Sequence, residues 1–308
     1  MAIRSSTDTN GGVKIISLLP SATEILFELG LGDDVVGVTF ECDFPAEAKS
    51  KRIVSTSALP EHLTPAEIDS IVKERMAAGE DLYHLDRGAF ADLEPDLVVT
   101  QNLCAVCAID VSEVDEALAF LACKAAVVTL DPMSLEQVIT SIGTVAAATG
   151  TESVAVELEA SLRQRLGVVA SKVAELAAPK VLVLEWTDPA FTAGHWVPDL
   201  VSAAGGTSVL AKPQKNSVGV EWDIIRACEA EVVIVSPCGY RLDGAAALGQ
   251  EVIDRGVLPD GAAVWAVDAD AFMVRPGPRV VEGVEVLASI FHPSVCGVPD
   301  TASARRLR

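Results

Sequence analysis

The sequence predicts an α/β protein of two lobes, each with a parallel sheet, joined by a long helix. Short runs of Val, Leu and Ile alternate with Ala-rich helical patterns. The runs are apolar nearly throughout, which is typical of parallel strands covered on both faces. This order stops at 134–177, where two helical patterns follow each other, and restarts after Pro179. A chain of 308 residues is also near the upper limit for one core, which favours two lobes.

The first half predicts a strand at Lys14–Leu18 and then a helix ending near Gly30. Ser21 and Glu24 have the spacing of a capping box at the start of that helix. A second helix is expected to begin with Thr64 as its cap and Pro65 at the first helical position. The remaining expected elements are strands at Val35–Val38, Asp96–Thr100 and Ala125–Leu130 and a helix at Val111–Ala122.

The middle of the chain predicts two helices, Ser134–Thr149 and Glu152–Ala177. In the second, leucines and valines repeat at steps of three and four, which forms a single apolar stripe. Its 26 residues would span about 39 Å at ~1.5 Å each, enough to cross a domain.

The second half predicts the same alternation of strands and helices as the first. The two halves are weakly alike, since VKIISLLP and PKVLVLEW each open one of them. Strands are expected at Lys180–Glu185, Val232–Val235 and Ala263–Val267, with helices at Val197–Ala204, Glu221–Cys228 and Arg279–Phe291. The expected organisation is a tail at 1–12, a lobe at 13–133, connecting helices at 134–178, a lobe at 179–293 and a tail at 294–308.

Composition excludes several partners. With a net charge of −21, nucleic acid and anionic membrane surfaces are unfavourable partners, because phosphate must be met by Lys and Arg. No run approaches the ~18 apolar residues of a spanning helix, so no membrane insertion is expected. The first residues do not form an export signal. We therefore expect a cytoplasmic protein if Met1 is the native start, and a periplasmic or cell-surface protein if a signal was removed.

Common enzyme motifs are absent from the sequence, which has no Walker A, GxSxG or HExxH string. The sequence therefore favours a ligand-binding protein over an enzyme and assigns no catalytic residue. Unusual residues instead follow the predicted strands, and in open α/β sheets ligands bind outside the carboxyl ends of the strands. The expected site is a cleft between the lobes.

Trp186, His195 and Trp196 form an aromatic cluster in a chain with four Trp. Indole faces suit a flat, partly apolar ligand, and an imidazole adds a polar or metal-coordinating contact. The alternative is a core Trp with a structural histidine. Arg275, in a Pro-Gly-Pro segment, either holds a carboxylate, amide or phosphate of the ligand or pairs with an acidic side chain.

Cys104 and Cys107 form a C-x-x-C pair. They could be half of a metal site or a redox dithiol, and Cys42 and His195 would complete a Cys₃His set for zinc or iron if the lobes close over it. The alternative is that these cysteines are buried packing residues.

These strings also carry a resemblance to a known family. Ile15–Leu26 and the segment Leu93–Val98 resemble the helical-backbone periplasmic binding proteins of the iron-siderophore and vitamin B12 class, over roughly residues 13–293. The resemblance implies two Rossmann-like lobes, a rigid backbone helix and a ligand held between the lobes. Within the class, the strings at 41–45, 100–108, 194–198 and 275–279 resemble a branch without export signals that is labelled cobalamin-binding.

The resemblance implies cobalamin, another corrinoid or a related metal complex as ligand, in the manner of an ABC-transporter substrate-binding protein. An exported member would dock on a permease through one acidic residue per lobe, with Glu113 and Glu221 as the candidates. The alternative is an intracellular metal–thiolate or redox protein that uses the cysteines and His195. The candidate ligand-binding residues are Pro20, Ser21, Glu41, Cys42, Gln101, Trp186, His195, Trp196 and Arg275.

Overall fold

The computed structural model describes residues 12–78, 80, 82–101 and 124–308. The chain divides into two compact units. Unit 1 comprises Met1–Asp131 with Ile139–Glu159, and unit 2 comprises Pro132–Val138 with Ala160–Arg308. Within the described ranges, none of the helices combines the length and apolar composition needed to cross a bilayer.

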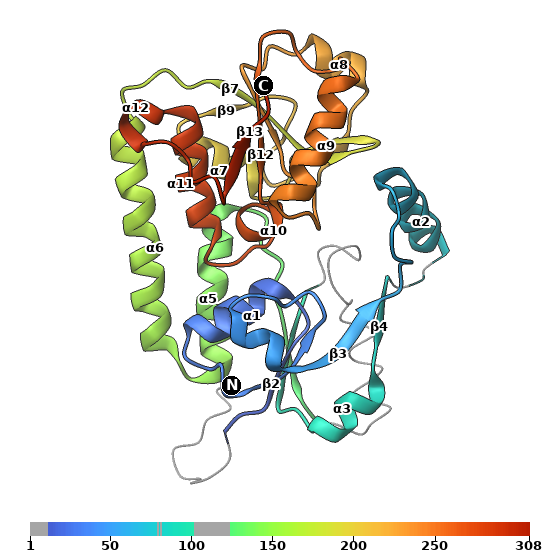
Figure 1. Cartoon of the computed structure of the whole chain (residues 1–308). Coiled ribbons are helices and arrows are strands. Elements are labelled where there is room, and N and C mark those ends of the chain that lie inside the picture. Colours follow the sequence, from blue (N-terminus) through green and yellow to red (C-terminus); the bar gives the residue numbers. More distant parts are fainter. Residues whose placement is uncertain (1–11, 79, 81, 102–123) are drawn as a thin grey trace. The chain divides into compact units, whose positions relative to one another are not determined.

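Unit 1 contains a mixed sheet in the order β4-β3-β2-β1-β5-β6, of which Figure 1 labels β2, β3 and β4. All neighbouring pairs are parallel except β3 and β4. The central strand β1 is fully buried, and its Ile15 and Ile16 belong to the core. The strands are β1 Ile15–Ser17, β2 Val35–Thr39, β3 Arg52–Ser57, β4 Tyr83–Leu85, β5 Leu97–Thr100 and β6 Ala126–Thr129.

The helices of unit 1 begin where the sequence supplies a start signal. In α2, Thr64 N–H donates to Glu67 Oε2 and Glu67 N–H donates to Thr64 Oγ1, which confirms the predicted cap. In α1, the expected box of Ser21 and Glu24 is wrong. Because Pro20 takes the first helical position, the N-cap is Leu19, which has no capping side chain. The elements are α1 Pro20–Glu28, η1 Ala46–Ser50, α2 Pro65–Ala78 and α3 Arg87–Leu93.

Unit 2 contains a second mixed sheet in the order β10-β8-β7-β11-β12-β13, with β9 beside β7. Its centre is parallel, as predicted, and its flanking strands β8, β10 and β13 are antiparallel. The strands are β7 Lys180–Thr187, β8 Ala190–Thr192, β9 Thr207–Ser208, β10 Val218–Gly219, β11 Val232–Val235, β12 Ala263–Val267 and β13 Ala304–Arg306.

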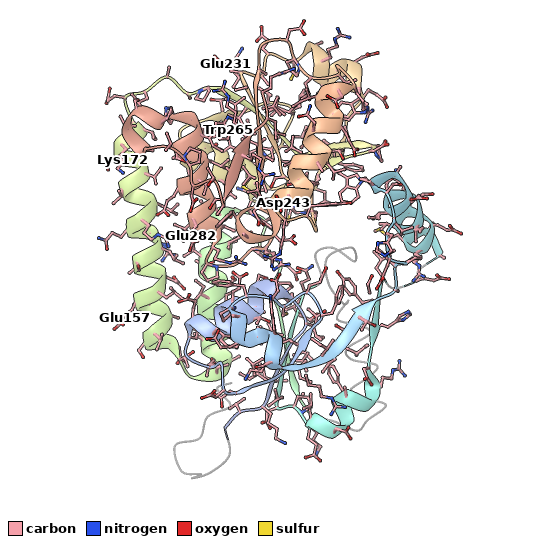
Figure 2. The ribbon with its side chains drawn as sticks, viewed as in Figure 1. Glu157, Lys172, Glu231, Asp243, Trp265 and Glu282 are labelled. Carbon is pink, nitrogen blue, oxygen red and sulfur yellow. The ribbon has the colours of Figure 1, made fainter. Side chains whose placement is uncertain are left out.

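Helices cover the unit 2 sheet (Figure 1). Helix α9 packs on β11, β12 and β13, and α11 packs on α7, α10 and α12. Asp243, in the first turn of α9 (Figure 2), accepts a hydrogen bond from Arg305 of β13 at 2.8 Å. The helices are α7 Val197–Ala203, α8 Trp222–Ala227, α9 Leu242–Asp254, α10 Ala269–Phe272, α11 Val280–Phe291 and α12 Pro293–Cys296.

Residues 294–308, which the sequence predicts to be a tail, instead contribute β13 to the unit 2 sheet. Trp265 of β12 (Figure 2) pairs with Arg306, and Val267 pairs with Ala304. This strand occupies the edge that β12 would otherwise leave with unpaired backbone groups, which is the reason to find it there.

Two helices contribute to both units: α5 Leu135–Thr149 and α6 Glu152–Val173. Helix α6 has 22 residues rather than the expected 26, so it spans about 33 Å at ~1.5 Å per residue. It ends at Val173, where the helical hydrogen bonds give way to a tighter turn in which Leu176 N–H donates to Val173 O at 3.0 Å. Pro179 follows this turn. Within unit 2, Arg165 of α6 makes a bidentate pair with Glu285 of α11.

Candidate functional site

The carboxyl ends of the unit 1 strands form the first candidate edge. Helix α1 begins here, so Pro20 and Ser21 are buried directly after β1. Thr23, one turn into the helix, lies 2.8 Å from Ser17 Oγ and 3.0 Å from Cys42 Sγ. These contacts join the end of β1, the start of α1 and the loop after β2. Cys42 is therefore held beside a hydroxyl in a buried position.

The same edge carries an aromatic and acidic group of side chains. The Tyr83 hydroxyl lies 3.3 Å from Glu41 Oε2, and its ring lies 6.2 Å from the ring of Phe40. Phe40 and Phe44 are each 41% exposed, so the edge offers apolar rings to a ligand. Gln101, directly after β5, is buried. The structure thus brings all five unit 1 candidates to this edge: Pro20, Ser21, Glu41, Cys42 and Gln101.

The carboxyl ends of β7, β11 and β12 form the corresponding edge of unit 2. Trp186, at the end of β7, is partly exposed, and its Nε1–H donates to Asp188 O at 3.1 Å. Its ring meets that of Tyr240, which follows β11, at a centroid distance of 5.9 Å and an interplanar angle of 62°. This edge-to-face arrangement is a favourable one for aromatic pairs.

His195 follows β8, in a loop that a second segment holds in place. Its N–H donates to Lys215 O at 2.6 Å, and its own carbonyl accepts from Gln214 N–H at 3.0 Å. The φ of His195 is +50°, which is the left-handed region and costs free energy for a non-glycine residue. We call residues 214–218 the strap, because they fix this loop. Glu185 of β7 accepts hydrogen bonds from Ser217 Oγ of the strap and from Gly194 N–H.

The imidazole of His195 is half-buried and tilted against Trp196, with ring centroids 5.6 Å apart. Burial lowers the pKa of His195 below its usual 6.5, and a hydrogen bond with Asn216 partly opposes this effect. At neutral pH the ring is therefore uncharged and keeps one nitrogen lone pair, which is the form that coordinates metals.

This pKa shift predicts a pH dependence of stability. Because the folded pKa is below the unfolded one, the unfolded state binds more protons between the two values, and stability falls as pH decreases through that window. We therefore expect the wild type to lose more unfolding free energy than His195→Gln as pH is lowered from about 8 to about 5. Urea titrations at several pH values measure it, and parallel curves for the two proteins would contradict it.

Trp196 and Arg275 occupy more enclosed positions in unit 2. Trp196 is 7% exposed, and its Nε1–H donates to Met273 O at 2.8 Å, so the indole anchors its loop to the end of α10. Arg275 lies 3.4 Å from Asp270, and each side chain is 13% exposed. Arg275 therefore has an acidic partner, one of the two roles that its sequence context allows.

Of the proposed Cys₃His set, the described residues include Cys42 and His195. Cys104 and Cys107, and the docking candidate Glu113, lie outside the described residues. Among the residues that are described, no group of three or more His, Cys, Asp or Glu side chains is arranged to hold a metal ion. The expected site between the lobes also stays a prediction, since the two units are described separately.

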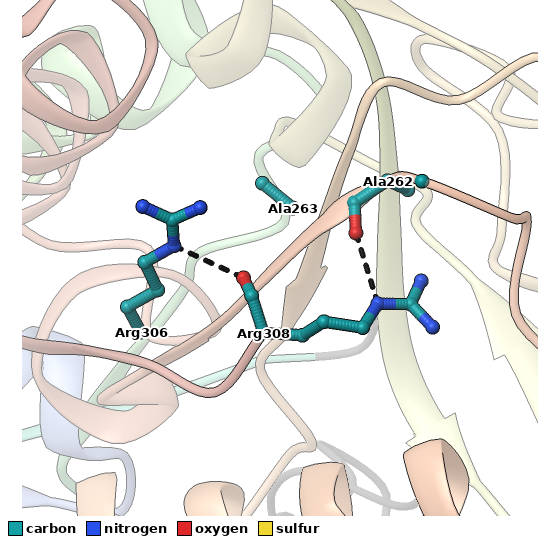
Figure 3. A pocket seen from close by; sticks show the side chains of 5 residues that line it. Ala262, Ala263, Arg306 and Arg308 are labelled. Atoms are coloured by element: carbon teal, nitrogen blue, oxygen red, sulfur yellow. Dashed lines mark hydrogen bonds between the residues drawn. The ribbon is translucent and has the colours of Figure 1, made fainter.

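A hollow of about 240 Å³ lies in unit 2 near the start of β12, lined by Gly261, Ala262, Ala263, Arg306 and Arg308 (Figure 3). It is at the amino end of a parallel strand, opposite to the edge where α/β sheets bind ligands. Arg308 donates to Ala262 O and Pro259 O, and Arg306 donates to Arg308 O. Because these guanidinium groups bind backbone carbonyls, we do not assign a ligand to this hollow.

Sequence reasoning missed several residues of the two edges. In unit 1 it missed Thr23, which contacts both Ser17 and Cys42, and Tyr83. In unit 2 it missed Tyr240 and Asp270. Tyr240 had one available signal, since it follows a Val-rich strand within a Pro-Cys-Gly-Tyr string.

Comparison with known proteins adds a family to this geometry. The family model described as "Periplasmic binding protein" matches residues 15–259. The chain is 26% identical to the uncharacterized ABC transporter substrate-binding lipoprotein YvrC of Bacillus subtilis, over 91% of this chain and 80% of that protein. It is 24% identical to the cobalamin-binding protein of Halobacterium salinarum, over 91% and 69% of the two chains.

Solved structures share the fold. The periplasmic vitamin B12 binding protein BtuF of Vibrio cholerae has a TM-score of 0.61 at 21% identity, covering 90% of this chain and 96% of that chain. The periplasmic haem-binding protein HutB of Vibrio cholerae has a TM-score of 0.68 at 18% identity, covering 91% and 99%. These similarities confirm the predicted two-lobe α/β fold.

Proposed function

The chain belongs to the periplasmic binding protein family, and on that premise we propose that it binds a corrinoid such as cobalamin, or a related metal macrocycle. One observation carries the proposal: unit 2 presents the Trp186–Tyr240 pair at the carboxyl edge of its sheet and a half-buried histidine in the loop after β8. Aromatic faces suit the flat apolar part of such a ligand, and an uncharged imidazole suits its metal or a polar group on its rim.

The named relatives support this ligand class. The Halobacterium relative is named for cobalamin, and the two solved structures are named for vitamin B12 and haem. The comparisons give no support to the alternative of an intracellular metal–thiolate or redox protein. Zinc and iron therefore enter this proposal only as the metal of a bound complex, and the role proposed is binding rather than turnover.

The relatives also bear on location and partner. One is a lipoprotein of an ABC transporter and others are periplasmic, so the expectation of a cytoplasmic protein receives no support from them. We propose the extracytoplasmic alternative, with an ABC permease as partner.

Glu221, exposed at the start of α8, is the described candidate for that contact. Glu221→Lys is expected to reduce transport of labelled cyanocobalamin while leaving its binding unchanged, and unaltered transport would exclude this role.

Titration of the purified protein with cyanocobalamin and with haemin tests the ligand class. We expect a saturable change in the visible spectrum with one of them, with matching heat by calorimetry. Trp186→Ala should weaken that binding about tenfold, which corresponds to roughly 1.4 kcal/mol for a central aromatic contact. Trp222→Phe is the control, since Trp222 instead stacks on Arg255 at the end of α9. No saturable signal with either compound would refute the proposal.

A further inference from the structure

Two loops at the carboxyl edge of unit 2 are tied together by one acidic side chain. Asp270, on α10 after β12, accepts a hydrogen bond from Gly239 N–H at 3.2 Å. It also pairs with Arg275 at 3.4 Å. Gly239 belongs to the loop after β11, has a φ of +81° and directly precedes Tyr240. Asp270 therefore fixes the backbone that aims the Tyr240 ring.

The Tyr240 ring is constrained on its other sides as well. The backbone N–H of Tyr240 donates to Pro237 O at 3.1 Å, which closes a tight turn. A Cβ on Gly244, in the first turn of α9, would lie 2.7 Å from Tyr240 Cδ1, so the ring rests directly on that helix. The opposite side meets Trp186 of β7. The Trp186–Tyr240 pair thus forms one aromatic wall. It is held by three segments that are distant in the sequence: β7, the loop after β11 and α10.

We propose that Tyr240 is a ligand-contacting residue and that Asp270 is its positioning residue, which holds the Tyr240 ring against Trp186 through Gly239. The proposal rests on the function proposed above and adds to it a residue pair and the chemistry it selects. The wall offers ring faces and edges together with one phenolic hydroxyl. It fits a flat ring whose rim carries hydrogen-bond acceptors, such as amide carbonyls or carboxylates.

The charges around the wall agree with these roles. Burial raises the pKa of Tyr240, so its phenol stays protonated at neutral pH and donates. Burial also raises the pKa of Asp270, while Arg275, Arg241 and the Gly239 N–H favour its charged form and Asp268 opposes it. A buried carboxylate with a cation and a backbone donor beside it is costly to replace, because the cation would lose its partner.

The first arm of the test needs no ligand. The emission of Trp186 is isolated as the difference between a protein and the same protein carrying Trp186→Phe. We expect Tyr240→Ala and Asp270→Ala to shift that emission in the same direction, since alanine removes the oxygen that accepts from Gly239 N–H. Asp243→Ala is the matched control, because the exposed Asp243 side chain pairs with Arg305 and not with Gly239. A Trp186 emission that Asp270→Ala leaves at the wild-type position would overturn the positioning role.

The second arm is a double-mutant cycle with cyanocobalamin or haemin, whichever the wild type binds. Tyr240→Ala should weaken binding roughly tenfold, and Asp270→Ala several-fold. The double variant should bind within about twofold of Tyr240→Ala, because Asp270 acts through that ring. Multiplied effects would overturn the coupling, and wild-type affinity in Tyr240→Ala would overturn the contact. If neither compound binds the wild type, the proposed function fails, and the first arm still decides the positioning.

Discussion

Gly283→Ala is expected to destabilise unit 2 by about 1–3 kcal/mol, the cost of overpacking a core. Gly283 lies in α11, where the helix passes against the end of α10. A Cβ there would sit far inside van der Waals contact with Phe272 O and 3.1 Å from the carbonyl carbon. Since both atoms belong to backbone, no side-chain rotation relieves the clash, and α10 and α11 must separate.

Gly167→Ala is the control and should have the opposite sign. Gly167 is an exposed residue of α6, and nothing lies within 4 Å of the place its Cβ would take. Ala is favoured over Gly in a helix interior by about 0.8–1.0 kcal/mol, so this variant should be more stable than the wild type. Urea unfolding followed by circular dichroism compares the two. An equal gain in stability in both variants would show that helix propensity, not packing on Phe272, governs Gly283.

The central strands were predictable because a parallel strand buried on both faces leaves a continuous apolar run. The ranges predicted for β11 and β12 are confirmed without change, since Val232–Val235 and Ala263–Val267 are such runs. Edge strands leave a weaker signal. The strand β13 (Ala-Arg-Arg) has one buried residue, and only its pairing with β12 makes it a strand.

The candidate edges were predictable in position but not in content. Residues that follow parallel strands must meet at one edge of a sheet, so Glu41, Gln101 and Trp186 could be placed from the strand pattern alone. Tyr240 and Asp270 could not, because their roles depend on contacts between segments that lie 30 or more residues apart. The local sequence places Tyr240 after a Val-rich strand, but it does not show that Asp270 holds the loop that carries it.

Gly194→Ala is expected to have the largest effect on ligand binding among variants that leave every candidate side chain in place. A Cβ at Gly194 would lie 2.6 Å from the carbonyl carbon of Asn216, and closer still to Lys215 O and Ser217 N. The strap would have to move away, and both backbone hydrogen bonds between it and His195 would break. Binding of cyanocobalamin or haemin should weaken tenfold or more, which corresponds to a loss of roughly 1.4 kcal/mol or more in binding free energy.

The titration of His195 reports this change without any ligand. Burial is what lowers its pKa, so an imidazole released from the strap should titrate closer to its usual 6.5. Nuclear magnetic resonance of the imidazole protons measures the midpoint. Gly219→Ala is the matched control on the neighbouring strand, because its Cβ would meet nothing closer than 3.8 Å. If Gly194→Ala raises the midpoint but leaves the affinity unchanged, His195 does not contact the ligand. If both change and Gly219→Ala changes neither, the strap is what keeps His195 in its binding position.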